Sequence, residues 1–186
     1  YNTNEARFYT RDCLRQRPEI ELSIYRVPGT RWSYFKPHYY LDLPMPIAAQ
    51  YFICFAGDEP VAHLAVCPMF QGGHYRATRL VVCAEWQGIG VGTAFLNEVC
   101  RLHLEGQGRC GRKYTTLFHT SHPQLCRALR KSSKWVQESG ALKFADKSKS
   151  IKTLDRSASR QGMKHGSGGF GGHFRAVQGF EYIGEQ

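Results

Sequence analysis

Residues 80–96 read LVVCAEWQGIGVGTAFL, and this stretch decides the fold. A β-branched apolar run comes first, three glycines at alternate positions follow, and an apolar stretch with helical spacing comes last. When a strand is followed by a glycine-rich segment and then by a helix, several backbone N–H groups and the positive end of the helix dipole point to one place. The stretch therefore predicts a binding site for an anion such as a phosphate group.

Two common phosphate-binding motifs do not fit these residues. A P-loop has Gly-Lys-Ser or Gly-Lys-Thr at the start of the helix, whereas Gly92 is followed by Thr93 and Ala94. A dinucleotide-binding fingerprint has Gly-x-Gly-x-x-Gly inside repeated parallel strand–helix units. Here the spacing is Gly-x-Gly-x-Gly, and the preceding strands are expected to form an antiparallel hairpin. The glycine-rich stretch is therefore expected to belong to another class of anion-binding loop.

The rest of the chain predicts alternating strands and helices around this stretch. Apolar and polar residues alternate at the strand positions, and apolar residues recur every three or four positions in the helices. Trp135 is predicted to be an apolar residue on the buried face of the second helix. The aromatic segment 32–47 is broken by prolines, so it is predicted to be a structured loop or a short helix. Strands are expected at 20–27, 49–56, 60–70, 75–84, 113–120 and 173–184, and helices at 90–104 and 122–136.

The composition predicts a basic protein of a reducing compartment. Lys and Arg number 25 against 15 Asp and Glu, so the formal net charge of +10 attracts nucleic acid, an anionic membrane or a phosphorylated cofactor. Seven cysteines form no Cys-x-x-Cys pair, which is typical of free thiols. Because no apolar run is long enough to span a bilayer, we expect a cytoplasmic protein without a membrane partner.

One domain is expected over residues 1–186. From Lys143 onward the chain becomes polar and basic, and it ends in a glycine-rich run, so 143–173 is predicted to be a mobile insertion that cannot bury much apolar surface. This segment is either a flap that contacts substrate or a linker without function. The polar start at Tyr1 suggests that the chain is a module of a longer protein.

The glycine-rich stretch resembles the acyl-CoA pyrophosphate loop of the GNAT acyltransferase superfamily. The resemblance rests on Gln-x-x-Gly-x-Gly after a strand and on the order of elements over 47–136. It implies an α/β GNAT fold, in which a mixed, mostly antiparallel central sheet is flanked by helices and its strands splay at an acyl-CoA cleft. It also implies that acetyl-CoA is the acyl donor. The residues expected at this cosubstrate are Leu80, Val81, Val82, Cys83, Gln87, Gly88, Ile89, Gly90, Val91, Gly92 and Thr93.

A finer resemblance concerns the branch of this superfamily. The segments RVPGTRWSYFKPHYYL, TRLVVCAEWQGIGVG, FHTSHPQLCRAL and GFEYIG are similar to a GNAT branch often attached to ABC-type ATPase modules, and to Mom-like DNA-modification proteins. This resemblance implies transfer to a nucleic-acid base, an ABC-type ATPase as an attached or partner module, and iron as a possible cofactor. Two alternatives stay open: an N-acetyltransferase for a protein or small-molecule amine, and a non-catalytic nucleic-acid-binding module with the same fold.

The catalytic base is not assigned by the sequence. Many acetyltransferases of this superfamily carry a Glu on the strand before the loop, whereas Arg76, Thr78 and Arg79 stand there. Candidate catalytic residues lie in the aromatic segment and after the strand at 113–120, where imidazole groups can exchange protons near neutral pH. Two of the histidines, together with His119, are alternatively candidate iron ligands. The catalytic candidates are His38, Tyr39, Ser121 and His122, and the metal candidates are His38 and His122.

Overall fold

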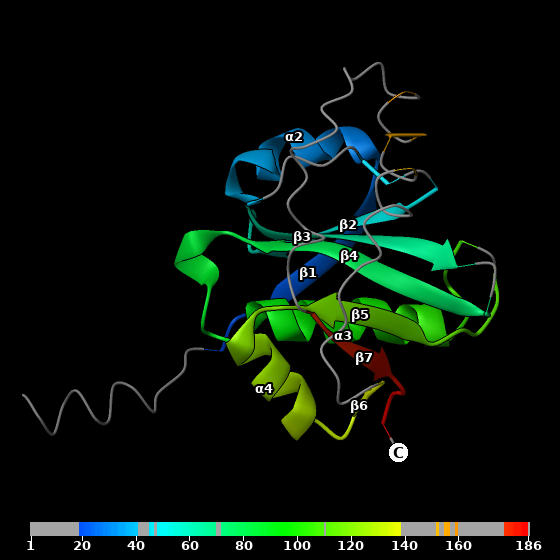
Figure 1. The fold of residues 1–186 in the computed structure, drawn as a ribbon. Coiled ribbons are helices and arrows are strands. Elements are labelled where there is room, and N and C mark those ends of the chain that lie inside the picture. The colour runs from blue at the N-terminus through cyan, green and yellow to red at the C-terminus, as the bar shows by residue number, and fades with distance from the viewer. Residues whose placement is uncertain are drawn as a thin grey trace, which may run out of the picture.

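The computed structural model describes residues 19–40, 45–46, 48–69, 72–109, 111–138, 152, 155–156, 159 and 177–185. The strands are β1 (Leu22–Val27), β2 (Gln50–Ala56), β3 (Glu59–Met69), β4 (His74–Val82), β5 (Thr116–Thr120), β6 (Trp135–Gln137) and β7 (Gln178–Tyr182). They form one seven-stranded sheet in the order β1-β2-β3-β4-β5-β7-β6 (Figure 1). Only β4 and β5 pair in parallel among these strands, which confirms the mixed, mostly antiparallel sheet predicted from the sequence.

Helices cover both faces of this sheet. On one face, α2 packs over the β2–β4 region, and on the other face α3 and α4 enclose the main hydrophobic core (Figure 1). The helix α3 carries buried residues along one side, at Phe95, Leu96, Val99 and Cys100, as its spacing predicted. The helices are η1 (Gly29–Arg31), α2 (Trp32–Phe35), η2 (Lys36–His38), η3 (Ala84–Trp86), α3 (Val91–Leu104) and α4 (Pro123–Lys131).

The parallel pair β4 and β5 is joined over a short length. Residues 75–77 pair with residues 116–118, and beyond them the two strands have no further paired residues. Both strands continue past this point, β4 to Val82 and β5 to Thr120, so the sheet opens between them. The predicted splay of the strands is therefore present, and beyond Ala77 it leaves one edge of β4 without a neighbouring strand among the described residues.

A β-bulge in β4 lies directly beyond the last residues that pair with β5. The β3–β4 register jumps between the pairs His63↔Val81 and Ala65↔Thr78, so two residues of β4 face one residue of β3. Arg79, within the bulge, has a φ of +52°, which a non-glycine residue seldom adopts. A bulge of this kind turns the local backbone and changes where the following groups point.

The second predicted helix is shorter than expected. Helix α4 begins at Pro123, but it ends at Lys131, and Trp135 opens strand β6 instead of continuing the helix. Ser132, the C-cap residue, already has extended backbone dihedrals, and serine favours turns over helix interiors. Trp135 is buried, and its indole Nε1 donates to Asn97 Oδ1 at 2.7 Å, so a tertiary contact with α3 fixes its place.

The remaining predictions concern the insertion, the cysteines and membrane-spanning helices. Of the insertion expected at 143–173, the structure describes only residues 152, 155–156 and 159, so its mobility stays a prediction. The described cysteines are free thiols, at Cys54, Cys67, Cys83, Cys100 and Cys126. Among the helices of the described ranges, none has the length and apolar character needed to cross a membrane.

Candidate active site

The open edge of β4 presents backbone groups more than side chains. The Cys83 N–H donates to Val61 O at 2.9 Å, so the backbone of Cys83 faces β3. Because backbone groups alternate along an antiparallel strand, those of Val82 face the opposite, open edge. The side chains of Val81 and Cys83 are buried under α2, while Leu80 and Val82 pack against the main core. Of the four residues predicted along the acyl-CoA arm, Val82 can therefore meet an extended ligand through its backbone, whereas the backbone groups of Cys83 are used in the pairing with β3.

The glycine loop leads from this edge to the N-terminus of α3. Gly88 has a φ of +81° and Gly90, the N-cap of α3, a φ of +101°, both in the region that favours glycine. Among the described residues, a Cβ built on either glycine meets no atom within 4 Å, so both positions face open space there. The first turn of α3 contains no acidic residue and has no side-chain cap, which leaves its N–H groups to an anion.

The third glycine of the stretch has a different role. A Cβ at Gly92 would lie 3.0 Å from Val82 Cγ2, which is tighter than ordinary van der Waals contact. The missing side chain at this position lets the first turn of α3 approach the end of β4. Helix packing, independent of any ligand, therefore accounts for Gly92, whereas the open surroundings of Gly88 and Gly90 fit the predicted anion site.

Two side-chain hydrogen bonds anchor the loop to the sheet. Gln87 Nε2 donates to Val82 O at 2.8 Å, across the turn from the end of β4. Trp86 Nε1 donates to Glu59 Oε1 at 3.0 Å, which ties η3 to the start of β3. The sequence assigned Gln87 to the anion site through its backbone, and the structure adds that its side chain holds the turn in place.

Gln87→Ala is expected to weaken acetyl-CoA binding about 5-fold, since a single partly exposed hydrogen bond contributes about 1 kcal/mol to the order of the loop. The dissociation constant should be measured by calorimetry, with Gln107→Ala as control, because Gln107 contacts an exposed Glu105 after α3 and not the glycine loop. Equal affinity in both variants would show that the Gln87 side chain does not order this loop.

The predicted aromatic segment forms a cluster on the α2 face of the sheet. Trp32 and Phe35 are buried there, and the Tyr39 ring packs edge-on against Trp32 at a centroid distance of 5.4 Å. The Arg79 guanidinium, from the β-bulge, lies 5.3 Å from the centroid of the Trp32 ring. Tyr40 is 63% exposed, so the cluster has a buried base and an aromatic outer surface.

A buried histidine lies beneath this cluster. His63 on β3 has 0% exposure, and its ring centroid is 5.0 Å from that of Trp32 and 5.4 Å from that of Phe35. Neither ring nitrogen makes a hydrogen bond of regular geometry among the described residues. Burial lowers the pKa of His63 to about 4, and the backbone of Arg79 opposes this shift only in part. The ring is therefore neutral at physiological pH.

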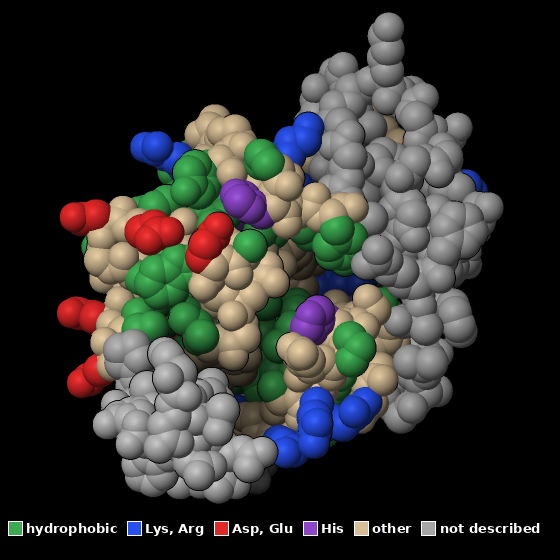
Figure 2. Space-filling view, turned by 90° about the vertical axis from the view of Figure 1, so that its left-hand side faces the viewer, with side chains coloured by type: hydrophobic (Ala, Val, Ile, Leu, Met, Phe, Trp, Pro, Cys, Tyr) green, Lys and Arg blue, Asp and Glu red, His purple; other side chains and the backbone are tan. Residues whose placement is uncertain are grey.

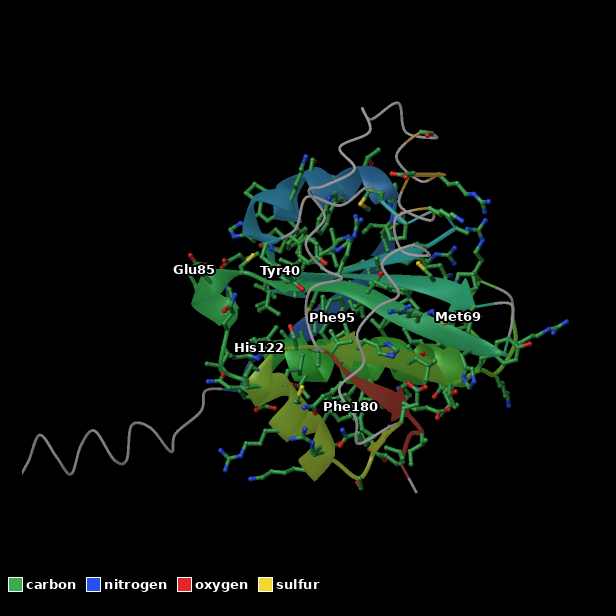
Figure 3. All side chains as sticks on the ribbon, in the orientation of Figure 1. Tyr40, Met69, Glu85, Phe95, His122 and Phe180 are labelled. Carbon is green, nitrogen blue, oxygen red and sulfur yellow. The ribbon has the colours of Figure 1, made fainter. Side chains whose placement is uncertain are left out.

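The catalytic candidates predicted after β5 lie at the mouth of the splay. His122 is exposed and caps α4, because its Nδ1 accepts a hydrogen bond from the Leu125 N–H at 3.3 Å. Ser121, also exposed, precedes it. Figure 3 places His122 at the same end of the sheet as Glu85, which belongs to η3 beside the glycine loop. The space-filling view of this end, in Figure 2, shows a hollow with hydrophobic side chains inside and Lys and Arg side chains along its lower rim.

The predicted iron site does not fit the described residues. His38 ends η2 and is exposed on the α2 side, whereas His122 caps α4 in the other helical layer. Within the described ranges, no group of three or more His, Cys, Asp or Glu side chains is placed to hold a metal ion. No chemical step is therefore assigned to iron.

The sequence missed a histidine–carboxylate pair on β5. His119 Nε2 lies 3.5 Å from Glu138 Oε2, and their side chains are 17% and 33% exposed. The pair lies over Gly179 of β7, where a Cβ would be 2.8 Å from Glu138 Oε2 and 3.0 Å from His119 Nε2. His119 was named with Ser121 and His122 among the candidates at the end of this strand, and also as an alternative iron ligand, but no local pattern joins it to a carboxylate so far along the chain.

Comparison with known proteins identifies the family. A model of the acetyltransferase (GNAT) family matches residues 19–130. The chain belongs to the GNAT acetyltransferase family. The splayed strands and the glycine loop described above are thus those of a GNAT domain, and the enzyme class predicted from the sequence is confirmed. No curated protein matches the sequence significantly.

Solved structures of GNAT proteins share the fold at low sequence identity. The chain is similar to the ribosomal-protein-S18-alanine N-acetyltransferase of Escherichia coli, with a TM-score of 0.54 and 10% identity over 89% of this chain and 96% of that one. A spermidine N-acetyltransferase variant from Vibrio cholerae has a TM-score of 0.56 and 9% sequence identity, and the match covers 86% of this chain and 92% of that one. A Bacillus anthracis protein assigned as a streptothricin acetyltransferase, solved in complex with acetyl-CoA, has a TM-score of 0.52 and 10% sequence identity. This match covers 90% of this chain and 99% of that one.

Proposed function

We propose that this GNAT protein transfers an acetyl group from acetyl-CoA to an amine that enters the β4–β5 splay from the α2 face. The observation that carries the proposal is the continuous path from the open edge of β4 to the glycine loop. The amide groups of the pantetheine arm would pair with the backbone groups that face the open edge of β4, such as those of Val82, and the pyrophosphate would lie on the N–H groups of 88–93. Acetyl-CoA supplies the thioester that reacts.

For the acceptor we favour the exocyclic amine of a nucleic-acid base. The aromatic cluster on the α2 face supports this choice, because extruded bases stack on aromatic side chains while basic residues hold the phosphates. Tyr40 and Tyr34 expose 63% and 53% of their surface there, and the chain carries a net charge of +10. An exocyclic base amine is a weak nucleophile, so this acceptor requires help with proton removal.

A second candidate acceptor is an aliphatic amine of a small molecule or a protein. The carboxylate of Glu138, on β6's side of the splay, would attract such an ammonium group. Two proteins with the same fold are named as acetyltransferases of spermidine and of an alanine of a ribosomal protein. The expected ABC-type ATPase partner, the Mom-like branch and the cytoplasmic location remain predictions.

The acceptor can be identified by mass spectrometry of products. Purified protein is incubated with acetyl-CoA and, separately, with mixed-sequence DNA, mixed-sequence RNA, spermidine and an alanine-starting peptide. Each sample is run with and without ferrous iron, and Gly90→Val is the matched inactive control. An acetylated nucleoside would support the base acceptor. Acetylated spermidine or peptide alone would favour the second candidate, and acetyl-CoA binding without any product would favour a non-catalytic module.

A further inference from the structure

A series of aromatic rings leads from the surface of the α2 layer to the bulge in β4. The Arg79 guanidinium and the Tyr39 ring both pack against the buried Trp32 ring, at 5.3 and 5.4 Å from its centroid. The Tyr40 ring follows, with its centroid 5.0 Å from that of Tyr39, and Tyr40 is 63% exposed. Figure 3 places Tyr40 at the same end of the sheet as His122. The outer ring of the series therefore lies at the mouth of the β4–β5 splay.

A second exposed tyrosine lies on the helical segment 29–38, which comprises η1, α2 and η2. Tyr34 is 53% exposed, and its ring packs edge-on against the buried Phe35 at a centroid distance of 4.9 Å. Arg31 and His38, both exposed, stand three residues before and four residues after Tyr34. Positions three and four apart on a helix are neighbours on its surface. We call the four exposed residues the α2 surface: Arg31, Tyr34, His38 and Tyr40.

The arginine of the α2 surface has no acidic partner among the described residues. The stretch 22–40 contains no Asp or Glu, and Arg31 forms no ion pair across the described ranges. Arg101 on α3 differs, because its guanidinium is paired with both Glu98 and Glu105. In Figure 2, the upper part of the molecule, at the height of α2, carries Lys, Arg and His side chains beside hydrophobic ones. A surface of this kind attracts an anionic partner.

The exposed rings narrow the chemistry of that partner. A tyrosine ring that faces solvent binds a flat group by stacking, and every nucleic-acid base offers a face for this contact. In a duplex the neighbouring base pairs cover those faces, whereas the bases of a single strand are open. The phosphates of the same strand would meet Arg31. An acidic peptide would supply negative charge without flat groups for Tyr34 and Tyr40.

We propose that the α2 surface binds single-stranded nucleic acid, with unpaired bases stacked on Tyr34 and Tyr40 and a phosphate on Arg31. This inference rests on the proposed function and narrows the acceptor to an unpaired base. Because Tyr40 lies at the mouth of the splay, a strand held on this surface presents its next bases to the opening. The protein then does not need to open a duplex to reach an exocyclic amine.

The first experiment measures the binding of labelled oligonucleotides by fluorescence anisotropy, without acetyl-CoA. The probes are a mixed-sequence single strand, its duplex, and a strand of equal length in which every site is abasic. The abasic strand keeps the phosphates but has nothing to stack. We expect the duplex and the abasic strand to bind at least about 10-fold more weakly than the single strand, since stacking on one aromatic ring contributes roughly that factor.

Substitutions of the tyrosines test the stacking directly. Tyr34→Leu and Tyr40→Leu should each weaken single-strand binding about 10-fold, whereas Tyr34→Phe and Tyr40→Phe should keep the wild-type affinity because the ring remains. Tyr114→Leu is the matched control, since the Tyr114 ring packs near Tyr75 and its hydroxyl accepts from Arg112. The melting temperature of each variant is measured, so that a loss of binding is not confused with a loss of folding.

The dependence of binding on salt tests the phosphate contact. Arg31→Gln should reduce the slope of log affinity against log salt concentration by about 0.7, the value for one phosphate contact to a single strand. Arg101→Gln is the control, because it removes the same formal charge from a guanidinium that already has two carboxylate partners. We expect Arg101→Gln to leave the slope unchanged.

The outcomes separate this inference from the proposed function. Equal affinity for all three probes, or unchanged affinity in both Tyr→Leu variants, would overturn the inference even if an acetylated nucleoside is formed. Binding of phosphatidylglycerol vesicles in place of oligonucleotides would also overturn it and assign the α2 surface to a membrane. Single-strand binding with the expected variant effects, but without any acetylated nucleoside, would support the α2 surface and overturn the base acceptor of the proposed function.

Discussion

Gly90→Val is expected to weaken acetyl-CoA binding about 100-fold, because the loss of two charge-assisted hydrogen bonds to a phosphate costs about 3 kcal/mol. The backbone at Gly90 has a φ of +101°, and a Cβ there would project into open space before the first turn of α3. The valine side chain would fill the volume in which the pyrophosphate must approach the N–H groups. Calorimetric titration with acetyl-CoA measures the effect directly.

Gly57→Val is the matched control for backbone strain. Gly57, in the hairpin turn between β2 and β3, also has a positive φ, of +58°, and a Cβ there also meets no atom of the described residues within 4 Å. Both substitutions force a β-branched residue into a left-handed conformation, so both should lower thermal stability. Only the change at Gly90 should reduce affinity. If both variants bound acetyl-CoA as tightly as the wild type, the loop would not be the pyrophosphate site.

The stability of the fold should fall as the pH is lowered from 7.5 to 5, and His63 should cause about 2 kcal/mol of that fall. Burial lowers the pKa of His63 from 6.5 to about 4 in the folded protein. Because the folded-state pKa lies below the unfolded one, this contribution is fully present above pH 6.5 and is lost as the pH falls toward 4. Protonating the ring would place a charge among the rings of Trp32 and Phe35.

Urea unfolding of wild type and His63→Leu at both pH values tests this contribution. The variant should lose about 2 kcal/mol less than the wild type between the two pH values, since it has no ring to protonate. Some dependence on pH should remain, because burial also lowers the pKa of His103, whose Nδ1 contacts Val99 O at 2.6 Å. The same loss of stability in both proteins would mean that His63 is not the group responsible.

Local patterns in the sequence were sufficient for the elements around the glycine loop. The β-branched run before Cys83 and the helical spacing after Gly90 each depend on residues close in the chain, and both elements formed where they were expected. The hairpin turn at Gly57 follows in the same way from a left-handed turn residue between two apolar runs. The sheet class and the enzyme class could be predicted because the order of these elements is specific to the fold.

Features that depend on distant segments could not be predicted. The bulge at Arg79 arises from the register between β3 and β4, and no local pattern marks a positive φ at an arginine. Trp135 fits an apolar helix position by spacing, but its contact with Asn97 of α3 holds it in a strand. His119 and Glu138 meet only because β5, β6 and β7 lie side by side, so the pair becomes visible in three dimensions alone.

The short pairing between β4 and β5 also affects how resistant the protein is to proteolysis. Three residue pairs connect one antiparallel half of the sheet to the other, and an acyl-CoA bound in the opening would contact both halves. A ligand at about 100 times its dissociation constant adds about 2.7 kcal/mol to the folded state. Cleavage by proteases that attack the unfolded chain should therefore slow when acyl-CoA is plentiful. The supply of the donor would then control how fast the protein is degraded as well as how fast it catalyses acyl transfer.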